Sequence, residues 1–110
     1  MGRDSLGEFE HQVMLAILQQ GGESYSVPVV LELEQRAARR EVRQAAVFIA
    51  LRRLEEKGLL RSRLVTTEDV AGRPRRYFRI TALGMRRLRE SRRALLRLWE
   101  GIDTALDGAG

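Results

Sequence analysis

The stretch VFIALRRLEEKGLLRSRLVTTEDVAGRPRRYFRIT, residues 47–81, decides the fold of this chain of 110 residues. Its first part predicts a helix, because four apolar residues recur on one helical face: Val47, Ala50, Leu51 and Leu54. The dipeptide Lys57-Gly58 then places a cation and a glycine where a helix commonly ends. Residues 60–65 and 75–81 alternate as two strands around the polar segment 66–74. The stretch therefore predicts a helix followed by a β-hairpin with a long tip.

Two more helices are predicted before this stretch and one after it. Apolar residues at helical spacing indicate helices over residues 8–20 and 26–38, with a short polar connection before the next helix. Thr81 is a suitable capping residue for a long amphipathic helix over residues 82–106. Gly101 interrupts the apolar pattern of this last helix without ending it.

This order of elements defines the expected architecture. Helix, helix, turn, helix, strand, wing and strand together indicate an α+β fold that is mostly α. We expect a winged helix-turn-helix domain, with three helices and a β-hairpin wing, over residues 1–81. A long C-terminal dimerisation helix follows over residues 82–106, and residues 107–110 are expected to be a disordered tail.

The basic charge of the chain is concentrated in its middle. The net charge is +5, and arginine supplies 19 of the 20 basic residues. Residues 36–97 carry a net charge of +13, whereas residues 1–35 carry −5 and residues 98–110 carry −3. Arginine binds phosphate and guanine through a planar fork of donors, so a basic face directed at nucleic acid is one interpretation. The other is a solvated helix face.

From about Leu6 to Trp99, the sequence resembles the PadR-like transcriptional regulators. The segments that carry the resemblance are LRRLEEKGLL at residues 51–60 and GRPRRYFRIT at residues 72–81. The first occurs in many winged helices, whereas the second is distinctive. The resemblance implies a homodimeric DNA-binding repressor of the short subgroup, in which one C-terminal helix makes the dimer.

Residues 43–57 form the expected recognition helix, and its exposed side carries the candidate DNA contacts. Gln can pair with adenine, Arg with guanine, and Phe can touch a thymine methyl group. The alternatives to DNA contact are that Phe48 packs in the core and that Arg52 is a solvated charge on the helix surface. At three of these positions the chain departs from the family pattern. Arg43 stands where the family usually has a capping Ser or Thr, Ala45 where it favours Gly, and Phe48 where it favours Tyr. The candidates on this helix are Arg43, Gln44, Ala45, Phe48 and Arg52.

The wing, residues 66–76, is rich in arginine and contains Pro74, which stiffens its tip. We expect it to contact the DNA backbone beside a minor groove. The alternative is a hairpin whose arginines only increase solubility. Its candidate DNA-binding residues, with one from the adjoining strand, are Arg73, Arg75, Arg76 and Tyr77.

The last helix has more apolar side chains than an 80-residue domain can cover, so a second copy of the chain is the expected partner. A two-fold dimer would present its recognition helices to a pseudo-palindromic operator in double-stranded DNA. Trp99 is the only tryptophan, and its two interpretations are a small aromatic effector site and packing at the dimer seam. The predicted interface residues are Phe9, Val13, Leu88, Leu95, Leu98, Trp99, Ile102 and Leu106.

The sequence argues against an enzyme. It has one histidine, His11, no cysteine and no glycine-rich phosphate loop, so no catalytic residue, metal site or cofactor is predicted. Its longest apolar runs are too short to cross a membrane, and a cytoplasmic location is expected. The sequence is compatible with two functions. The first is a homodimeric, DNA-binding transcriptional repressor released by a small aromatic ligand, and the second is a winged-helix module that binds protein.

Overall fold

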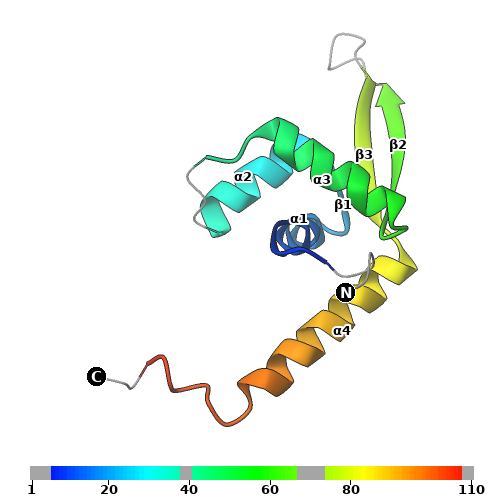
Figure 1. Ribbon diagram of the computed structural model, residues 1–110. Helices are drawn as coiled ribbons and strands as arrows, with labels where there is room; N and C mark the ends of the chain where they lie inside the picture. The colour runs from blue at the N-terminus through cyan, green and yellow to red at the C-terminus, as the bar shows by residue number, and fades with distance from the viewer. Residues whose placement is uncertain (1–5, 38–40, 67–73, 108–110) are drawn as a thin grey trace.

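The computed structural model describes residues 6–37, 41–66 and 74–107. Three helices, α1 (Glu8–Gln19), α2 (Ser26–Arg36) and α3 (Gln44–Glu56), pack together beside a small sheet. The sheet consists of β1 (Glu23–Ser24), β2 (Leu60–Thr66) and β3 (Pro74–Ile80). The last helix, α4 (Ala82–Trp99), projects away from this body, so the molecule is elongated (Figure 1). The structure confirms the predicted α+β, mostly helical winged fold.

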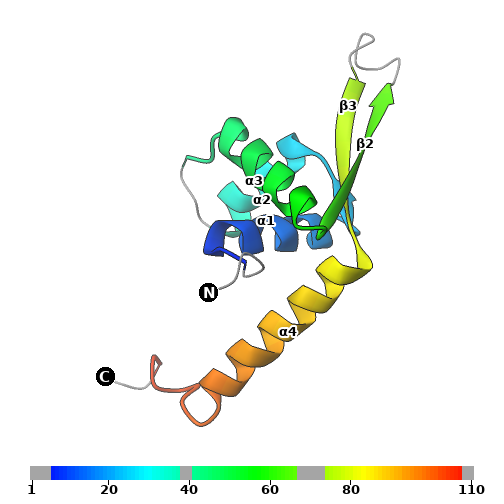
Figure 2. The same cartoon turned by 45° about the vertical axis from the view of Figure 1, so that its right-hand side comes forward.

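The sheet is antiparallel, with β3 in the middle between β1 and β2. In the hairpin, Leu60 pairs with Ile80 and Thr66 with Pro74, so the two strands are in register over their whole length. The alternation of β3 directs Phe78 into the core, where its side chain is 1% exposed. Figure 2 shows the hairpin rising beyond the helices. The sequence predicted both hairpin strands to within one residue at each end.

One core joins the helices to the base of the sheet. Burying one large apolar side chain completely contributes about 1.5–3 kcal/mol to stability relative to leaving it exposed. The apolar face predicted for α3, which carries Val47, Leu51 and Leu54, is buried in this core. The core residues are Val13, Met14, Ala16, Ile17, Val29, Leu33, Val47, Ala50, Leu51, Leu54, Leu59, Leu60, Phe78 and Leu88.

The C-terminal end of α3 and the start of α4 follow the local rules that the sequence indicated. Gly58 has φ +79°, a left-handed conformation that a C′ glycine adopts without steric cost. Thr81 Oγ1 accepts a hydrogen bond from the Gly84 backbone N–H at 3.0 Å. Thr81 therefore caps α4 as predicted.

The predicted extent of the last helix was wrong. We expected a helix over residues 82–106, but α4 ends at Trp99. Glu100 leaves the helical conformation with ψ 126°, and Gly101 has φ +80°. Ile102 and Leu106 lie in turns rather than on the helix. Glycine adopts this left-handed conformation easily, so Gly101 ends the helix instead of only interrupting the apolar pattern.

Candidate nucleic-acid interface

Four of the five residues predicted on the recognition helix lie on α3 outside its buried face, and the fifth, Arg43, directly precedes the helix. The buried face is held in the core by Val47, Leu51 and Leu54, which fixes the rotation of the helix. The five predicted residues are exposed as a result: Arg43, Gln44, Ala45, Phe48 and Arg52. Side chains near the start of such a helix are those that reach base edges when a helix enters a major groove.

The start of α3 has no side-chain cap. Arg43 occupies the N-cap position with φ −79° and ψ 130°, and its side chain accepts no capping hydrogen bond. A guanidinium group only donates, so it cannot satisfy the free N–H groups of the first turn. Gln44 instead donates from Nε2 to the Ser26 hydroxyl of α2 at 3.0 Å. The open N–H groups and the helix dipole make this end of α3 electropositive.

Phe48 is an exposed residue that touches one core side chain. Its ring meets the Phe78 ring edge to face, with centroids 6.1 Å apart and an interplanar angle of 80°. The residue remains 41% exposed. Phe48 is therefore not a core residue, and its exposed part is available for contact with a groove.

A polar network connects α3 to the hairpin. Ser62 of β2 donates to Glu55 Oε2 from its hydroxyl at 2.5 Å and from its backbone N–H at 3.1 Å. Arg76 of β3 donates from Nη1 to the same hydroxyl at 2.9 Å. The Nε of Arg52 lies 3.9 Å from Glu55 Oε1. The hydrogen bonds from Ser62, followed by the charges of Arg52 and Arg76, lower the pKa of Glu55.

The network places Arg76 beside α3, whereas Arg75 and Tyr77 lie on the other face of the hairpin. The Cζ of Arg75 stands over the Tyr25 ring at 4.1 Å from its centroid. The rings of Tyr25 and Tyr77 are 5.2 Å apart. Arg73, the remaining predicted wing residue, lies outside the described residues. The structure therefore divides the predicted wing contacts between two faces.

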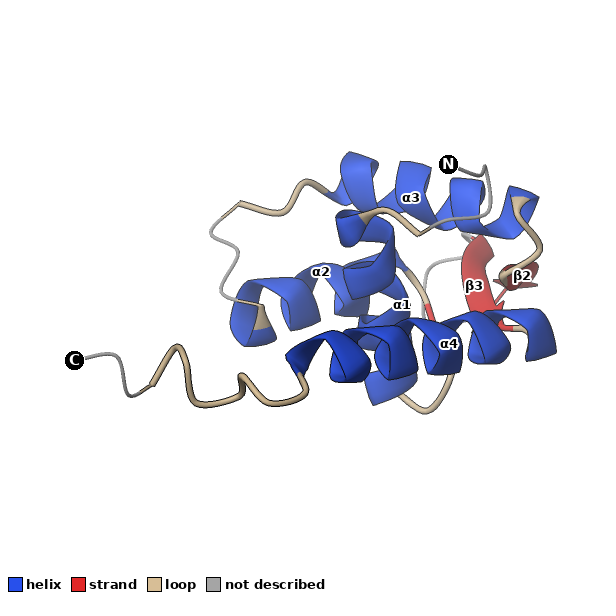
Figure 3. Ribbon diagram, turned by 60° about the horizontal axis from the view of Figure 1, so that its bottom comes forward, coloured by secondary structure: helices blue, strands red, loops and turns tan. Residues whose placement is uncertain are grey.

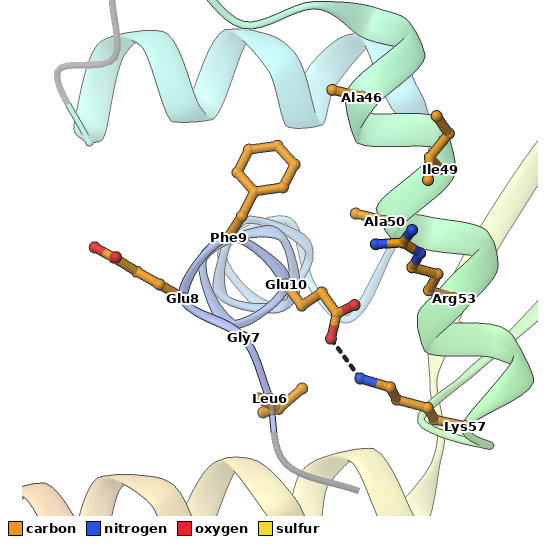
Figure 4. A pocket seen from close by; sticks show the side chains of 10 residues that line it. All are labelled: Leu6, Gly7, Glu8, Phe9, Glu10, Ala46, Ile49, Ala50, Arg53 and Lys57. Carbon is orange, nitrogen blue, oxygen red and sulfur yellow. Dashed lines mark hydrogen bonds and ion pairs between the residues drawn. The ribbon is translucent and has the colours of Figure 1, made fainter. Parts of the chain in front are cut away.

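Between the start of α1 and α3 there is a pocket of about 620 Å³, shown in Figure 4. Phe9 projects from α1 beside it, and Arg53 points into it from α3. Lys57 Nζ pairs with Glu10 Oε1 at 2.7 Å across the pocket. This ion pair ties the end of α3 to α1. The sequence pattern gave no sign of it, because the two residues are far apart along the chain.

An apolar groove of about 520 Å³ lies between α1 and α4. Leu88 is 6% exposed, whereas Leu95 is 49% and Trp99 39% exposed. Figure 3 shows α4 passing in front of α1, and Figure 2 shows that the two helices diverge. The prediction included Leu88, Leu95 and Trp99 of this groove and missed its other apolar residues, Leu15, Leu18, Met85 and Leu96. The residues that line the groove are His11, Leu15, Leu18, Met85, Leu88, Arg89, Arg92, Leu95, Leu96 and Trp99.

Some predicted interface residues lie elsewhere. Val13 is fully buried within a single chain, so its assignment to a dimer interface is corrected to the core. Phe9 packs against the core and lines the pocket at the start of α1. Leu98 is 73% exposed but is not among the residues that line the groove. The helical spacing separated apolar from polar positions but could not show which apolar positions α1 covers.

Within the described parts of the chain, no group of three or more His, Asp or Glu residues is arranged to hold a metal ion. Across the same residues, no helix is both long enough and apolar enough to span a membrane.

A helix-turn-helix made by α2 and α3, followed by a β-hairpin, defines a winged-helix protein. The family profile described as "Transcriptional regulator PadR-like family" matches residues 14–90. The chain therefore belongs to the PadR-like family of transcriptional regulators, which are not enzymes. No curated protein matches the chain significantly.

Solved structures of the family have the same fold. A PadR family transcriptional regulator from Eggerthella lenta is 29% identical, with a TM-score of 0.67, and the match covers 87% of this chain and 81% of that one. A PadR-like transcription factor from Bacteroides fragilis is 26% identical, with a TM-score of 0.71 and 88% of each chain covered. Bacillus subtilis PadR in complex with operator DNA is 12% identical, with a TM-score of 0.63, and the match covers 76% of this chain and 45% of that one.

Proposed function

We propose that this regulator is a sequence-specific DNA-binding repressor that acts as a homodimer in the cytoplasm. The observation that carries the proposal is the exposed face of α3, whose first turn has no side-chain cap and which lies beside a basic hairpin. Hydrogen bonds between Ser62 of the hairpin and Glu55 of α3 join the two elements. The operator complex of the Bacillus subtilis relative supports the same use of the fold by analogy.

In this proposal, α3 enters the major groove. Gln44 and Arg52 present amide and guanidinium donors that suit adenine and guanine, and Phe48 offers a ring edge to a thymine methyl group. Arg43 contacts a phosphate beside the open start of the helix, where the dipole attracts anions. Ala45 lies against the groove without adding a polar group. A good bidentate base contact discriminates against the wrong base by about 1–3 kcal/mol.

The hairpin contacts the backbone that flanks the major groove. Arg76 lies on the side of the hairpin that faces α3, so it suits a phosphate of the same duplex. Arg73 extends this contact into the adjoining minor groove, where arginine is attracted to narrow A·T stretches. Arg75 and Tyr77 lie on the other face of the hairpin and contact DNA backbone from that face. Because phosphate contacts carry no base information, the wing supplies affinity and α3 supplies sequence preference.

A second copy of the chain covers the α1–α4 groove. Leu95 and Leu96 are 49% and 55% exposed in the single chain, on a helix that projects from the body. An exposed apolar groove of this kind is typical of a self-association surface. The two recognition helices would then face successive major grooves about 34 Å apart, and the operator would be a pseudo-palindrome.

Trp99 lies at the end of α4 and lines the groove with few polar neighbours. A small flat aromatic molecule that inserts beside it would change the packing of the dimer and the spacing of the recognition helices. Release of the operator by such an effector is part of the proposed regulation.

Selection of duplexes from a random pool, followed by binding at several salt concentrations, tests the proposal. The logarithm of the binding constant should fall with the logarithm of salt at a slope of about −0.9 for each phosphate contacted. The footprint should be two-fold symmetric. If no duplex is enriched and binding is independent of salt, the alternative of a winged-helix module for protein partners is favoured instead.

A further inference from the structure

The face of the sheet turned away from the helices carries a cluster of arginines. Phe78 and Leu60 point into the core, so alternation directs Arg75, Tyr77 and Arg79 of β3 to the opposite side. We name this surface the outer sheet face. It comprises Glu23, Tyr25, Arg61, Arg63, Arg75, Tyr77 and Arg79, four cations against one carboxylate.

Arg61 and Arg79 are directly opposite each other in the β2–β3 register, and both are exposed. Like charges at opposed positions destabilise an antiparallel pair. Glu23 pairs with Arg79 on the other strand but is engaged by Arg63, whose Nε and Nη2 donate to its two carboxylate oxygens at 3.0 and 3.1 Å. The repulsion between Arg61 and Arg79 is therefore only partly compensated. An arrangement that opposes folding indicates a role in binding an anion.

Two arginines of this face are held against aromatic rings. Arg75 stands over Tyr25 at 4.1 Å, and Arg63 stands over Tyr77 at 5.6 Å. A guanidinium that stacks on a ring still has its in-plane N–H donors available, and it loses less side-chain freedom when it binds phosphate. Because the rings are already covered by guanidinium groups, the face suits a phosphate backbone better than unpaired bases that would stack on tyrosine.

The outer sheet face and α3 lie on opposite sides of the hairpin. Ser62 and Arg76 lie on the side of the hairpin toward α3, where Ser62 bonds to Glu55 and Arg76 bonds to Ser62. Arg61 and Arg75 are at the alternate positions of the same strands and project to the other side. A duplex held at α3 would have to bend around the hairpin to reach the outer sheet face. Bending a short site by 40–90° costs about 1–6 kcal/mol. A separate duplex reaches it without that cost.

We propose that the outer sheet face binds the phosphate backbone of a second DNA duplex while α3 holds the first. From Arg75 to Arg79 the cationic strip runs about 13 Å along β3, at about 3.3 Å per residue. Duplex DNA presents a phosphate about every 3.4 Å along each strand, so several phosphates face a strip of this length. Binding is independent of sequence, because no base edge is involved. This inference rests on the proposed function in one respect, which is that the first duplex is bound at α3.

The test is a two-duplex capture experiment. A selected duplex is immobilised and saturated with protein, and a labelled duplex of unrelated sequence is then added at low salt. The wild-type protein should retain the labelled duplex, and Arg61→Gln/Arg79→Gln should retain at least tenfold less. The matched control Arg86→Gln/Arg93→Gln removes the same charge from exposed positions of α4 and should behave as wild type.

Two further readouts separate a binding role from a structural one. The affinity and salt slope of Arg61→Gln/Arg79→Gln for the selected duplex alone should be unchanged, and its thermal midpoint should rise because the opposed charges are gone. Equal capture by wild type and variant, or no capture by either, overturns the proposal. A salt slope shallower by about 1.8 on the single duplex also overturns it, because the face would then contact the first duplex. A lowered thermal midpoint would show that the arginines are structural.

The outcomes also separate this inference from the proposed function. If the wild-type protein binds no selected duplex, the proposed function fails, and capture of a labelled random duplex by the protein itself still tests the outer sheet face. If the selected duplex binds and the second does not, only the inference about the outer sheet face fails.

Discussion

Arg76 donates a hydrogen bond from Nη1 to the Ser62 hydroxyl at 2.9 Å, and that hydroxyl is bound in turn to Glu55 of α3. One serine therefore connects the wing to the recognition helix. This polar link helps to hold the angle between the two elements, beside the packing of Phe48 against Phe78. A regulator that places a helix and a hairpin on one duplex needs this angle to be fixed.

The lowered pKa of Glu55 leads to a pH-dependent prediction. A carboxyl whose pKa is depressed by folding contributes stability above its unfolded pKa, which is near 4.5, and loses it as pH falls through the folded value. Glu55→Gln should therefore unfold more easily than wild type at neutral pH. The difference should shrink as pH falls below about 4.5, because the protonated wild-type side chain resembles glutamine. Urea unfolding at a series of pH values measures this, and a difference that stays constant with pH would refute it.

The α1–α4 groove predicts which substitutions disrupt the dimer. Leu95→Glu introduces a charge into the groove and should give monomers at micromolar concentration, since an unpaired charge is costly to bury. Leu98→Glu is the matched control, because Leu98 is exposed and is not among the groove residues. Sedimentation velocity distinguishes the two species. Identical behaviour of both variants would exclude the groove as the interface.

Gly84 marks a close contact between α4 and the sheet. A Cβ at this position would lie 2.3 Å from the Leu59 carbonyl oxygen. Gly84→Ala gains about 1 kcal/mol of helix propensity, but overpacking against backbone costs about 1–3 kcal/mol, so we expect net destabilisation. Gly7→Ala is the control, since its Cβ would meet no atom within 4 Å. Thermal unfolding followed by circular dichroism gives the comparison, and a Gly84→Ala protein as stable as wild type would show that α4 can shift.

Arg75 provides a test of backbone contact. Arg75→Ala should weaken capture of the second duplex by a similar factor whatever its sequence, and it should make the salt slope of that capture shallower by about 0.9, which is the loss of one phosphate contact. The change would also uncover the Tyr25 ring. Fluorescence anisotropy with selected and random duplexes measures both effects. A loss confined to one duplex sequence would instead make Arg75 a base contact.

The sequence predicted the elements whose signals are local. The buried face of α3, the Gly58 helix end and the Thr81 cap all depend on spacing or on one residue type, and each was confirmed. The end of the last helix was missed because the apolar spacing continues through Gly101 to Leu106. The spacing of apolar side chains does not reveal that the backbone leaves the helical conformation at Glu100 and Gly101.

The contacts between distant segments could not be predicted. Glu55 and Ser62 meet only because the hairpin folds back beside α3, and Lys57 meets Glu10 only because α1 packs there. The cross-strand register decides that Arg61 faces Arg79. The alternation of residues along each strand assigned them to one side or the other, but it did not show which arginines of the two strands would lie on the same face of the sheet.

The central claim is that the exposed face of α3 distinguishes one DNA sequence from another, and titration of wild type and Arg52→Ala against a selected duplex and its single-base variants tests it most directly. Wild type should prefer the selected duplex to random DNA by at least about 10³. Arg52→Ala should lose about 1–3 kcal/mol on the selected duplex and become indifferent at a single base position. Equal affinity of the wild-type protein for selected and random duplexes would contradict the account.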